Sequence, residues 1–386
     1  MNDRERALTL LRRIEGESLY ASLVLQNDSG FVRTLVLGVL RWRSRLDFAI
    51  SSFAARRIEP EILDVLRLGA FQLLFTDVAA YAVVAETVEL APRWARGFVN
   101  AILRKIASGK APEPASVATR TAHPEWLMDR WTSFFGAERA VAIALADQQL
   151  SYPDVLTLSG EVPPDSVRSD LVDGIWKLHG SSAALDRSSW WPMDEGSAVV
   201  AAIAANAGEE VLDLAAAPGG KSLYAATRGR RVFSSDVSMA RLRPLITRDP
   251  RHVVVSDGRR PPFARRFQTV LLDAPCSATG TIRKNPEIKW RLQESDLAAF
   301  SRLQRDLLTS ALGVAGETCV YSTCSLEPEE NDAVVAEALA SNPEFELADV
   351  RPYSPPGVGP WIDGRVLRLT PESGADGFIV HVLRRK

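Results

Sequence analysis

The sequence predicts a multidomain protein, with an all-α N-terminal part followed by an α/β C-terminal part. Residues up to about Ala107 show helical apolar periodicity, whereas from about Asp194 short apolar strands alternate with helices. The chain of 386 residues is long enough for two or three domains. Its hydrophobic content of 46% is typical of a globular protein.

The N-terminal helices are best seen in the run EILDVLRLGAFQLLF, which begins at Glu61. Ile62, Val65 and Leu66 fall on one helical face, and Arg67 and Gln72 crowd the other. This spacing predicts an amphipathic helix of a bundle.

A linker is predicted over residues 107–126, which contain three prolines and little apolar periodicity. A second helical stretch follows from Glu125 to about Leu150, and the region from Ser151 to Pro192 shows no clear pattern. We therefore divide the chain into a helical domain at 1–110, a linker with a small helical or mixed subdomain at 111–192, and an α/β domain at 193–386.

Six apolar runs in the last part predict the strands of its sheet. They alternate with helices, which favours a parallel sheet. The runs are EEVLDL, RRVFSSD, RHVVVSD, QTVLLD, ETCVYST and GFIVHVL.

Two of the three cysteines lie just beyond a predicted strand. Cys276 follows QTVLLD and Cys324 follows ETCVYST. Open α/β sheets bind ligands at the carboxyl ends of their strands, so we expect both thiols to face one crevice. A disulfide is not expected from three cysteines in a chain without a secretory signal. Cys319 lies inside the strand and is predicted to pack in the core.

Four of the strands end in aspartate, at Asp213, Asp236, Asp257 and Asp273. Carboxylates are costly to bury at strand ends without a ligand or a helix N-terminus. The turn after the first strand, AAAPGGKS, has neither the GxGxxG spacing of dinucleotide folds nor the GxxxxGK[ST] of a P-loop. We therefore predict S-adenosylmethionine, with Asp236 at the ribose and Asp257 near the adenine.

Charge and hydropathy set further limits. No run of 18 apolar residues is present and the N-terminus is too charged for a signal peptide, so we expect a cytoplasmic protein without a membrane partner. The net charge of -2 does not indicate nucleic-acid binding, although all but seven of the 46 basic residues are arginine, which suits phosphate contacts. The four histidines are scattered, so no metal is predicted.

Several motifs resemble the Sun (RsmB-type) RNA cytosine-5 methyltransferases. These are DLAAAPGGK, DAPCSATG with IRKNPEIKW, YSTCSLEPEEN and the DGF of Asp376 to Phe378. FVRTLVLGVLRWRSRLD, LRLGAFQLLF and GFVNAILRK resemble the NusB-like RNA-binding domain of bacterial members. The resemblance implies a NusB-like bundle and a Rossmann-like class I methyltransferase domain. It also implies S-adenosylmethionine as the methyl donor and ribosomal RNA, most specifically that of the small subunit, as the substrate. We expect the protein to be a monomer.

The resemblance also implies residue roles. Cys324 attacks C6 of the cytosine, Asp273 stabilises the protonated N3 of the adduct, and Cys276 acts in release. The cofactor residues are Ala215, Ala216, Ala217, Pro218, Gly219, Gly220, Lys221, Asp236, Asp257 and Asp273. From their position after the DAPC loop, we expect Arg283, Lys284, Lys289 and Arg291 to hold the phosphates that flank the target base.

Two positions and one stretch of the chain depart from the family pattern. Ala215 replaces a cysteine, Met193 replaces a glutamine before the first strand, and the stretch from Leu150 to Pro192 is shorter than the ferredoxin-like RNA-binding subdomain expected there. A tRNA cytosine-5 methyltransferase and a non-catalytic RNA-binding assembly factor remain as alternatives. A DNA cytosine-5 methyltransferase would leave Cys324 and the NusB-like part unexplained.

Overall fold

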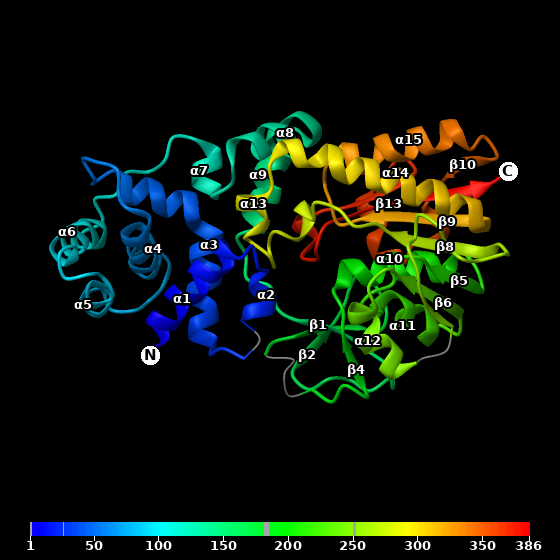
Figure 1. Ribbon diagram of the computed structural model, residues 1–386, viewed down its shortest axis with the longest axis horizontal. Helices are drawn as coiled ribbons and strands as arrows, with labels where there is room; N and C mark the ends of the chain where they lie inside the picture. The colour runs from blue at the N-terminus through cyan, green and yellow to red at the C-terminus, as the bar shows by residue number, and fades with distance from the viewer. Residues whose placement is uncertain (1, 26, 181–184, 250–251) are drawn as a thin grey trace. The chain divides into compact units, whose positions relative to one another are not determined.

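The structure is a computed structural model that describes residues 2–25, 27–180, 185–249 and 252–386 (Figure 1). The chain divides into two compact units. The helical unit comprises residues 1–149 together with 282–292, and the sheet unit comprises 150–281 and 293–386. This division differs from the boundary expected near residue 110, because helices up to Ala146 pack with the N-terminal ones.

The helical unit is all-α, as predicted. Its core is built from the apolar faces of α1, α3, α4 and α6. Its helices are α1 (Asp3–Gly16), α2 (Ala21–Val24), α3 (Gly30–Ser51), α4 (Pro60–Phe75), α5 (Ala80–Leu90), α6 (Arg96–Ala107), α7 (Val117–Thr121), α8 (Glu125–Phe135), α9 (Ala137–Ala146) and α13 (Ile288–Arg291).

The polar face expected on α4 is partly buried. Arg67 is only 6% exposed, and its guanidinium forms two hydrogen bonds of 2.7 and 2.8 Å with the carboxylate of Asp47 on α3. Gln72 is fully buried and accepts a hydrogen bond of 2.8 Å from Arg4 on α1. A bundle of this size surrounds α4 on more than one side, so its polar residues find partners inside.

Two sheets make up the sheet unit. The small one is antiparallel, in the order β2-β3-β1-β4, and fills the region whose fold the sequence did not predict. Its strands are β1 (Asp154–Thr157), β2 (Ser166–Arg168), β3 (Ile175–Leu178) and β4 (Trp190–Pro192).

Among the described residues, the large sheet has nine strands in the order β11-β12-β13-β9-β8-β5-β6-β7, with β10 paired to β13. Strands β5 to β9 are parallel, as predicted, whereas β10 to β13 are antiparallel, so the sheet is mixed. Its strands are β5 (Glu210–Asp213), β6 (Arg231–Asp236), β7 (Val253–Val255), β8 (Phe267–Asp273), β9 (Ala315–Thr323), β10 (Phe345–Ala348), β11 (Ile362–Asp363), β12 (Val366–Leu369) and β13 (Phe378–Arg385).

Helices cover both faces of this sheet (Figure 1). One face carries α10 (Glu195–Asn206), α11 (Gly220–Thr227) and α12 (Met239–Arg248), and the other carries α14 (Leu297–Val314) and α15 (Asp332–Ser341). Successive strand residues point to opposite faces. On β8, Leu271 therefore packs with α10 while Val270 and Leu272 pack with α14.

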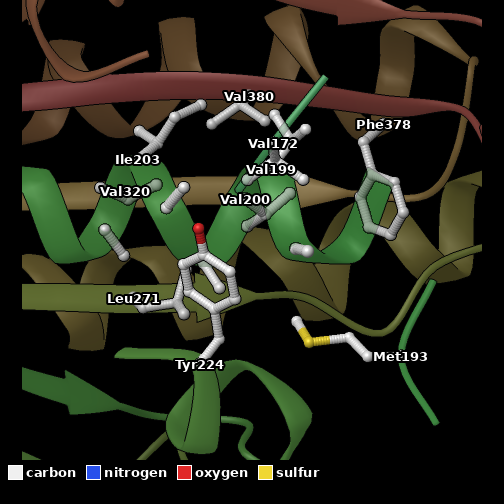
Figure 2. Close-up of a cluster of buried hydrophobic side chains, with 14 of the residues drawn as sticks. Val172, Met193, Val199, Val200, Ile203, Tyr224, Leu271, Val320, Phe378 and Val380 are labelled. Atoms are coloured by element: carbon white, nitrogen blue, oxygen red, sulfur yellow. The ribbon is translucent and has the colours of Figure 1, made fainter. Parts of the chain in front are cut away.

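The core on the α10 side is drawn in Figure 2. Leu271 of β8 and Val320 of β9 lie with Val199 and Ile203 of α10 in one cluster. Cys319, next to Val320, points to the other face and is fully buried, so the predicted core role is confirmed. Burial raises the pKa of the Cys319 thiol to about 12.

Candidate active site

The two cysteine loops meet at the carboxyl end of the large sheet. Strands β8 and β9 are parallel neighbours, with Asp273 opposite Ser322, so the loops that follow begin side by side. The Sγ atoms of Cys276 and Cys324 lie 3.3 Å apart. Both residues line a cavity of about 450 Å³, which confirms that the two thiols face one crevice.

The Cys276 thiol is held in its protonated form. The hydrogen bond with Cys324 raises the pKa of Cys276 well above its usual range, and burial and the negative charges of Cys324, Glu330 and Asp273 raise it further. Of two adjacent thiols, the one that keeps its proton can donate a hydrogen bond to the other as a thiolate. By geometry either sulfur can donate this hydrogen bond, and the raised pKa of Cys276 favours its sulfur as the donor.

Asp273 lies beside the thiols at the end of β8. Its Oδ2 is 2.6 Å from Nζ of Lys221, and its Oδ1 accepts a hydrogen bond of 2.8 Å from the hydroxyl of Ser322. Burial alone would lower the pKa of Lys221, but the carboxylates of Asp273 and Asp213 raise it above its usual value. Lys221, predicted as a cofactor residue, thus lies at the Asp273 carboxylate as a cation.

The other end of the cavity carries two of the strand-end acids. Asp236 is 6% exposed, and its carboxylate accepts hydrogen bonds from the backbone N–H groups of Ala217 at 3.0 Å and Ser238 at 2.8 Å. Asp257 is more exposed, and Arg259 donates side-chain and backbone hydrogen bonds that lower the pKa of Asp257 to about 2. Both carboxylates lie on the cavity wall as hydrogen-bond acceptors.

The AAAPGGK turn contributes fewer lining residues than expected. Ala215 and Ala217 line the cavity, while Ala216 donates its backbone N–H to Ser235 and is 5% exposed. The peptide bond between Ala217 and Pro218 is cis. Gly219 has a φ of 113°, and a Cβ there would lie 2.7 Å from Cβ of Leu245, so this position requires glycine.

Gly220 begins α11 and faces the core instead of the cavity. A Cβ built on it would lie 3.6 Å from Met193, which is buried in the core (Figure 2). Met193, the departure from the family pattern, thus fills apolar space beside the turn. Asp213 also faces inward, because its side chain accepts a hydrogen bond of 2.7 Å from Ser222 under the turn.

Backbone hydrogen bonds join the cysteine loops to the loop before β13, a feature that the sequence did not reveal. Gly280 donates to the carbonyl of Cys324 at 2.9 Å, and Gly377 donates to the carbonyl of Gly280 at 2.7 Å. A Cβ on Gly280 would lie 2.6 Å from the carbonyl oxygen of Gly377. The DGF motif is therefore part of the same loop cluster.

The four basic residues after the DAPC loop, predicted to hold phosphates, lie in the helical unit, and the side chains of three of them contact protein groups. Lys289 is 1% exposed and donates a hydrogen bond of 3.0 Å to the carbonyl of Arg41. Arg283 is buried beside Asp147, and the guanidinium of Arg291 donates to the carbonyls of Ser18, Ile14 and Leu19.

These protein contacts have a simple physical reason. The segment 282–292 packs with the N-terminal helices, so Lys289 and Arg291 donate to backbone carbonyls there, and the carbonyl of Arg283 accepts a hydrogen bond from Arg41. Lys284 is half-buried. Sequence reasoning treated the run as a solvent-facing loop because charge alone does not reveal burial.

Among the described residues, no group of three or more histidine, cysteine, aspartate or glutamate side chains is placed to hold a metal ion. His123 and His381 each contact an aspartate, Asp147 at 3.4 Å and Asp332 at 3.1 Å. Within the same described part of the chain, no helix combines the length and hydropathy that a membrane span requires.

Comparisons with known proteins agree with this geometry. A family model described as 16S rRNA methyltransferase RsmB/F matches residues 200–384, and the NusB family model matches residues 1–108. Ribosomal RNA small subunit methyltransferase B of Thermus thermophilus is 34% identical, over 93% of this chain and 89% of that protein. This chain belongs to the RsmB/F family of rRNA methyltransferases.

Other relatives extend the match. The Sodalis glossinidius ribosomal RNA small subunit methyltransferase B is 30% identical, over 89% of this chain and 90% of that protein. The crystal structure of PH0851 matches with a TM-score of 0.77 at 23% identity, over all of this chain and 99% of that one, and thus shares the fold. The NusB match confirms the predicted N-terminal domain type.

The methyl donor of this RsmB/F family member is S-adenosylmethionine. The cavity fits this group, because about 450 Å³ lies within the usual range for small-molecule sites. Its wall offers carboxylate acceptors at Asp236 and Asp257, and apolar surface at Leu303 and Leu307.

Proposed function

We propose that this RsmB/F family methyltransferase methylates C5 of a cytosine in small-subunit ribosomal RNA through a covalent cysteine adduct. The observation that carries the proposal is the pair of thiols, whose Sγ atoms lie 3.3 Å apart. They lie beside the Asp273 carboxylate, which is paired with Lys221, and they line the same cavity as Asp236 and Asp257. C5 of cytosine is a poor nucleophile, so its methylation requires prior addition to C6.

Cys324 is proposed as the nucleophile. Its thiolate forms an S–C6 bond, and the π electron pair of the C5–C6 double bond shifts toward N3, which takes a proton from solvent; the resulting enamine makes C5 nucleophilic. Asp273 accepts a hydrogen bond from the protonated N3. Lys221 and Ser322 hold the Asp273 carboxylate for this task.

S-adenosylmethionine supplies an electrophilic methyl group on a sulfonium sulfur. Asp236 and Asp257 are proposed to accept hydrogen bonds from its ribose and adenine, with Ala215 and Ala217 along its length. Of the other predicted cofactor residues, Ala216, Pro218, Gly219 and Gly220 shape the turn instead.

Release needs the C5 proton to pass to solvent water, so that the electron pair of the C5–H bond re-forms the C5–C6 double bond and the S–C6 bond breaks to expel the Cys324 thiolate, while the N3 proton also returns to solvent. Cys276 is proposed to act here. Its proton can pass to the departing Cys324 sulfur over the 3.3 Å hydrogen bond, which stabilises the leaving thiolate. The target base must leave its stack to reach both sulfurs, at a cost of a few kcal/mol.

The test separates the two cysteines. Cys324→Ala should form no covalent RNA adduct and no 5-methylcytosine, because the raised pKa of Cys276, the neighbouring thiol of the cavity, keeps that sulfur protonated. Cys276→Ala should still add and methylate, but an RNA–protein band resistant to denaturing gels should accumulate. Both variants are incubated with small-subunit rRNA transcripts and S-adenosylmethionine.

Cys319→Ala serves as the matched control, because Cys319 lies in the core away from the cavity and should behave as wild type. If Cys276→Ala abolished the adduct and Cys324→Ala trapped it, the roles would be reversed. Bisulfite sequencing of rRNA and tRNA from a deletion strain distinguishes the two substrates. Loss of a methylated cytosine from tRNA alone would overturn the rRNA assignment.

A further inference from the structure

One buried carboxylate links the two cysteine loops. Glu330 lies in the short 3₁₀ turn Pro328–Glu330 after β9 and is fully buried. Its Oε2 accepts the backbone N–H of Ser277 at 2.9 Å, and its Oε1 accepts the hydroxyl of Ser325 at 2.6 Å. These serines directly follow Cys276 and Cys324.

Two further donors complete the arrangement. Gln304 of α14 donates to Oε2 of Glu330 at 2.8 Å and to the carbonyl of Pro275 at 2.9 Å, and the Ser277 hydroxyl donates to Oε1. An ionised carboxylate accepts about four hydrogen bonds and donates none. Every oxygen of Glu330 is therefore engaged by groups that hold the cysteine loops.

The charge of Glu330 is unusual for its surroundings. Within the described part of the chain, the donors around it are neutral and no lysine, arginine or histidine forms an ion pair with it. A buried charge without a counter-ion is costly, and a glutamine could not accept all of these hydrogen bonds because its amide group donates. An apolar side chain could fill the same space without the free-energy cost of a buried charge.

We propose that Glu330 is a positioning residue that holds the Cys276 and Cys324 loops in register for attack and release. The inference rests on the proposed function, since it assigns Glu330 to the reaction of the two thiols. Its negative charge also contributes to the raised pKa of Cys276, which helps that thiol keep its proton.

A first experiment needs no RNA. Full-length protein is alkylated with iodoacetamide over a range of pH, and modification of each cysteine is followed by mass spectrometry. In Glu330→Gln, the alkylation midpoint of Cys276 should move by about one pH unit toward acid, because a nearby negative charge is removed. Glu337→Gln, the same exchange at an exposed carboxylate on α15, should leave the midpoint unchanged.

A second experiment measures the reaction. The probe is a small-subunit rRNA transcript that carries 5-fluorocytidine, which blocks release and traps the adduct. Glu330→Gln should form the adduct about 10- to 100-fold more slowly, because displacement of a reacting group by about 1 Å has effects of that size. Its affinity for S-adenosylmethionine, measured by calorimetry, should stay within about twofold, since Glu330 does not line the cavity.

The two experiments separate the inference from the proposed function. If wild type forms no adduct but the alkylation shift is present, the proposed function fails and the positioning of the thiols stands. If Glu330→Gln matches wild type in both measurements, the positioning role is overturned. Should Glu330→Gln not fold, Ser325→Ala removes one donor with little change in volume and should slow adduct formation several-fold, whereas an unchanged rate would overturn the inference.

Discussion

The aspartate side chains at the strand ends differ in burial and in the cations beside them. Asp273 is paired with Lys221, and Asp257 is exposed and paired with Arg259. Asp213 has no cation in contact among the described residues and is 1% exposed. Burial therefore raises the pKa of Asp213 from 3.8 to about 6, although the hydrogen bond from Ser222 and the charge of Lys221 oppose the rise.

This shift predicts how stability depends on pH. A folded-state pKa above the unfolded value means that the contribution of Asp213 to stability is fully present below about pH 4 and is lost as pH rises through about 6. Asp213→Asn removes this dependence and keeps an acceptor for Ser222. We expect wild type to lose up to about 3 kcal/mol relative to Asp213→Asn over that window.

Scanning calorimetry of the cofactor-free protein between pH 4 and 8 measures the effect. Asp129→Asn, at an exposed carboxylate on α8, is the control and should follow wild type at every pH. Parallel curves for wild type and Asp213→Asn would contradict the raised pKa.

At the scale of elements, the segment 282–292 is the largest surprise. It leaves the sheet unit after Thr281 and packs in the helical unit as α13 and its flanks. Burial lowers the pKa of Lys289 to about 7, and it raises the pKa of Asp147, near Lys289, Arg283 and Arg41, to about 7. Each of these buried charges is therefore stabilised by the opposite charges near it.

A double-mutant cycle tests that dependence. Lys289→Met or Asp147→Asn alone leaves a buried charge with a weaker counter-charge and should lower the free energy of unfolding of the helical unit by about 3 kcal/mol. The double variant should lose less than the sum, because neither charge remains. Urea unfolding followed by tryptophan fluorescence provides the measurement.

The exposed pair Arg45–Glu113 is a suitable comparison, at 2.9 Å but near solvent. Its coupling should be about 0.2–1 kcal/mol. Additive effects of the Lys289 and Asp147 changes would show that these two groups do not interact.

Sequence patterns predicted the strands of the parallel sheet and the meeting of the thiols for a clear reason. A strand end in a parallel sheet fixes where its loop begins, so Asp273 and Cys324 could be placed without coordinates. The role of Glu330 could not be predicted, because a glutamate in an acidic run is read as solvated. Burial of Lys289 depended on long-range packing, which no local pattern encodes.

At the scale of the whole molecule, the two units should contribute differently to ligand binding. All residues that line the active-site cavity belong to the sheet unit. Removal of residues 1–149 should therefore leave affinity for S-adenosylmethionine within a few-fold, but it uncovers the apolar side chains of Ile282 and Ile288 and the buried Lys289. The truncated chain should aggregate.

Replacement of 282–292 by a Gly/Ser linker in the truncated chain should restore a monodisperse species that binds S-adenosylmethionine but binds RNA less tightly and with a flatter salt dependence. Size-exclusion chromatography, calorimetry and RNA filter binding in a salt series test these points. A truncated chain that stays monodisperse with its own 282–292 would contradict the dependence of this segment on the N-terminal helices.

The passage of the chain through the helical unit between Thr281 and Gln293 has an evolutionary consequence. A domain attached only at one terminus can be lost, gained or exchanged by a single recombination event. Here such an event would leave the eleven residues 282–292, which follow the Cys276 loop, without the helices that they pack against. The gene would therefore need a second, simultaneous change some 130 codons away. The NusB-like part and the methyltransferase part of this chain are therefore expected to descend together.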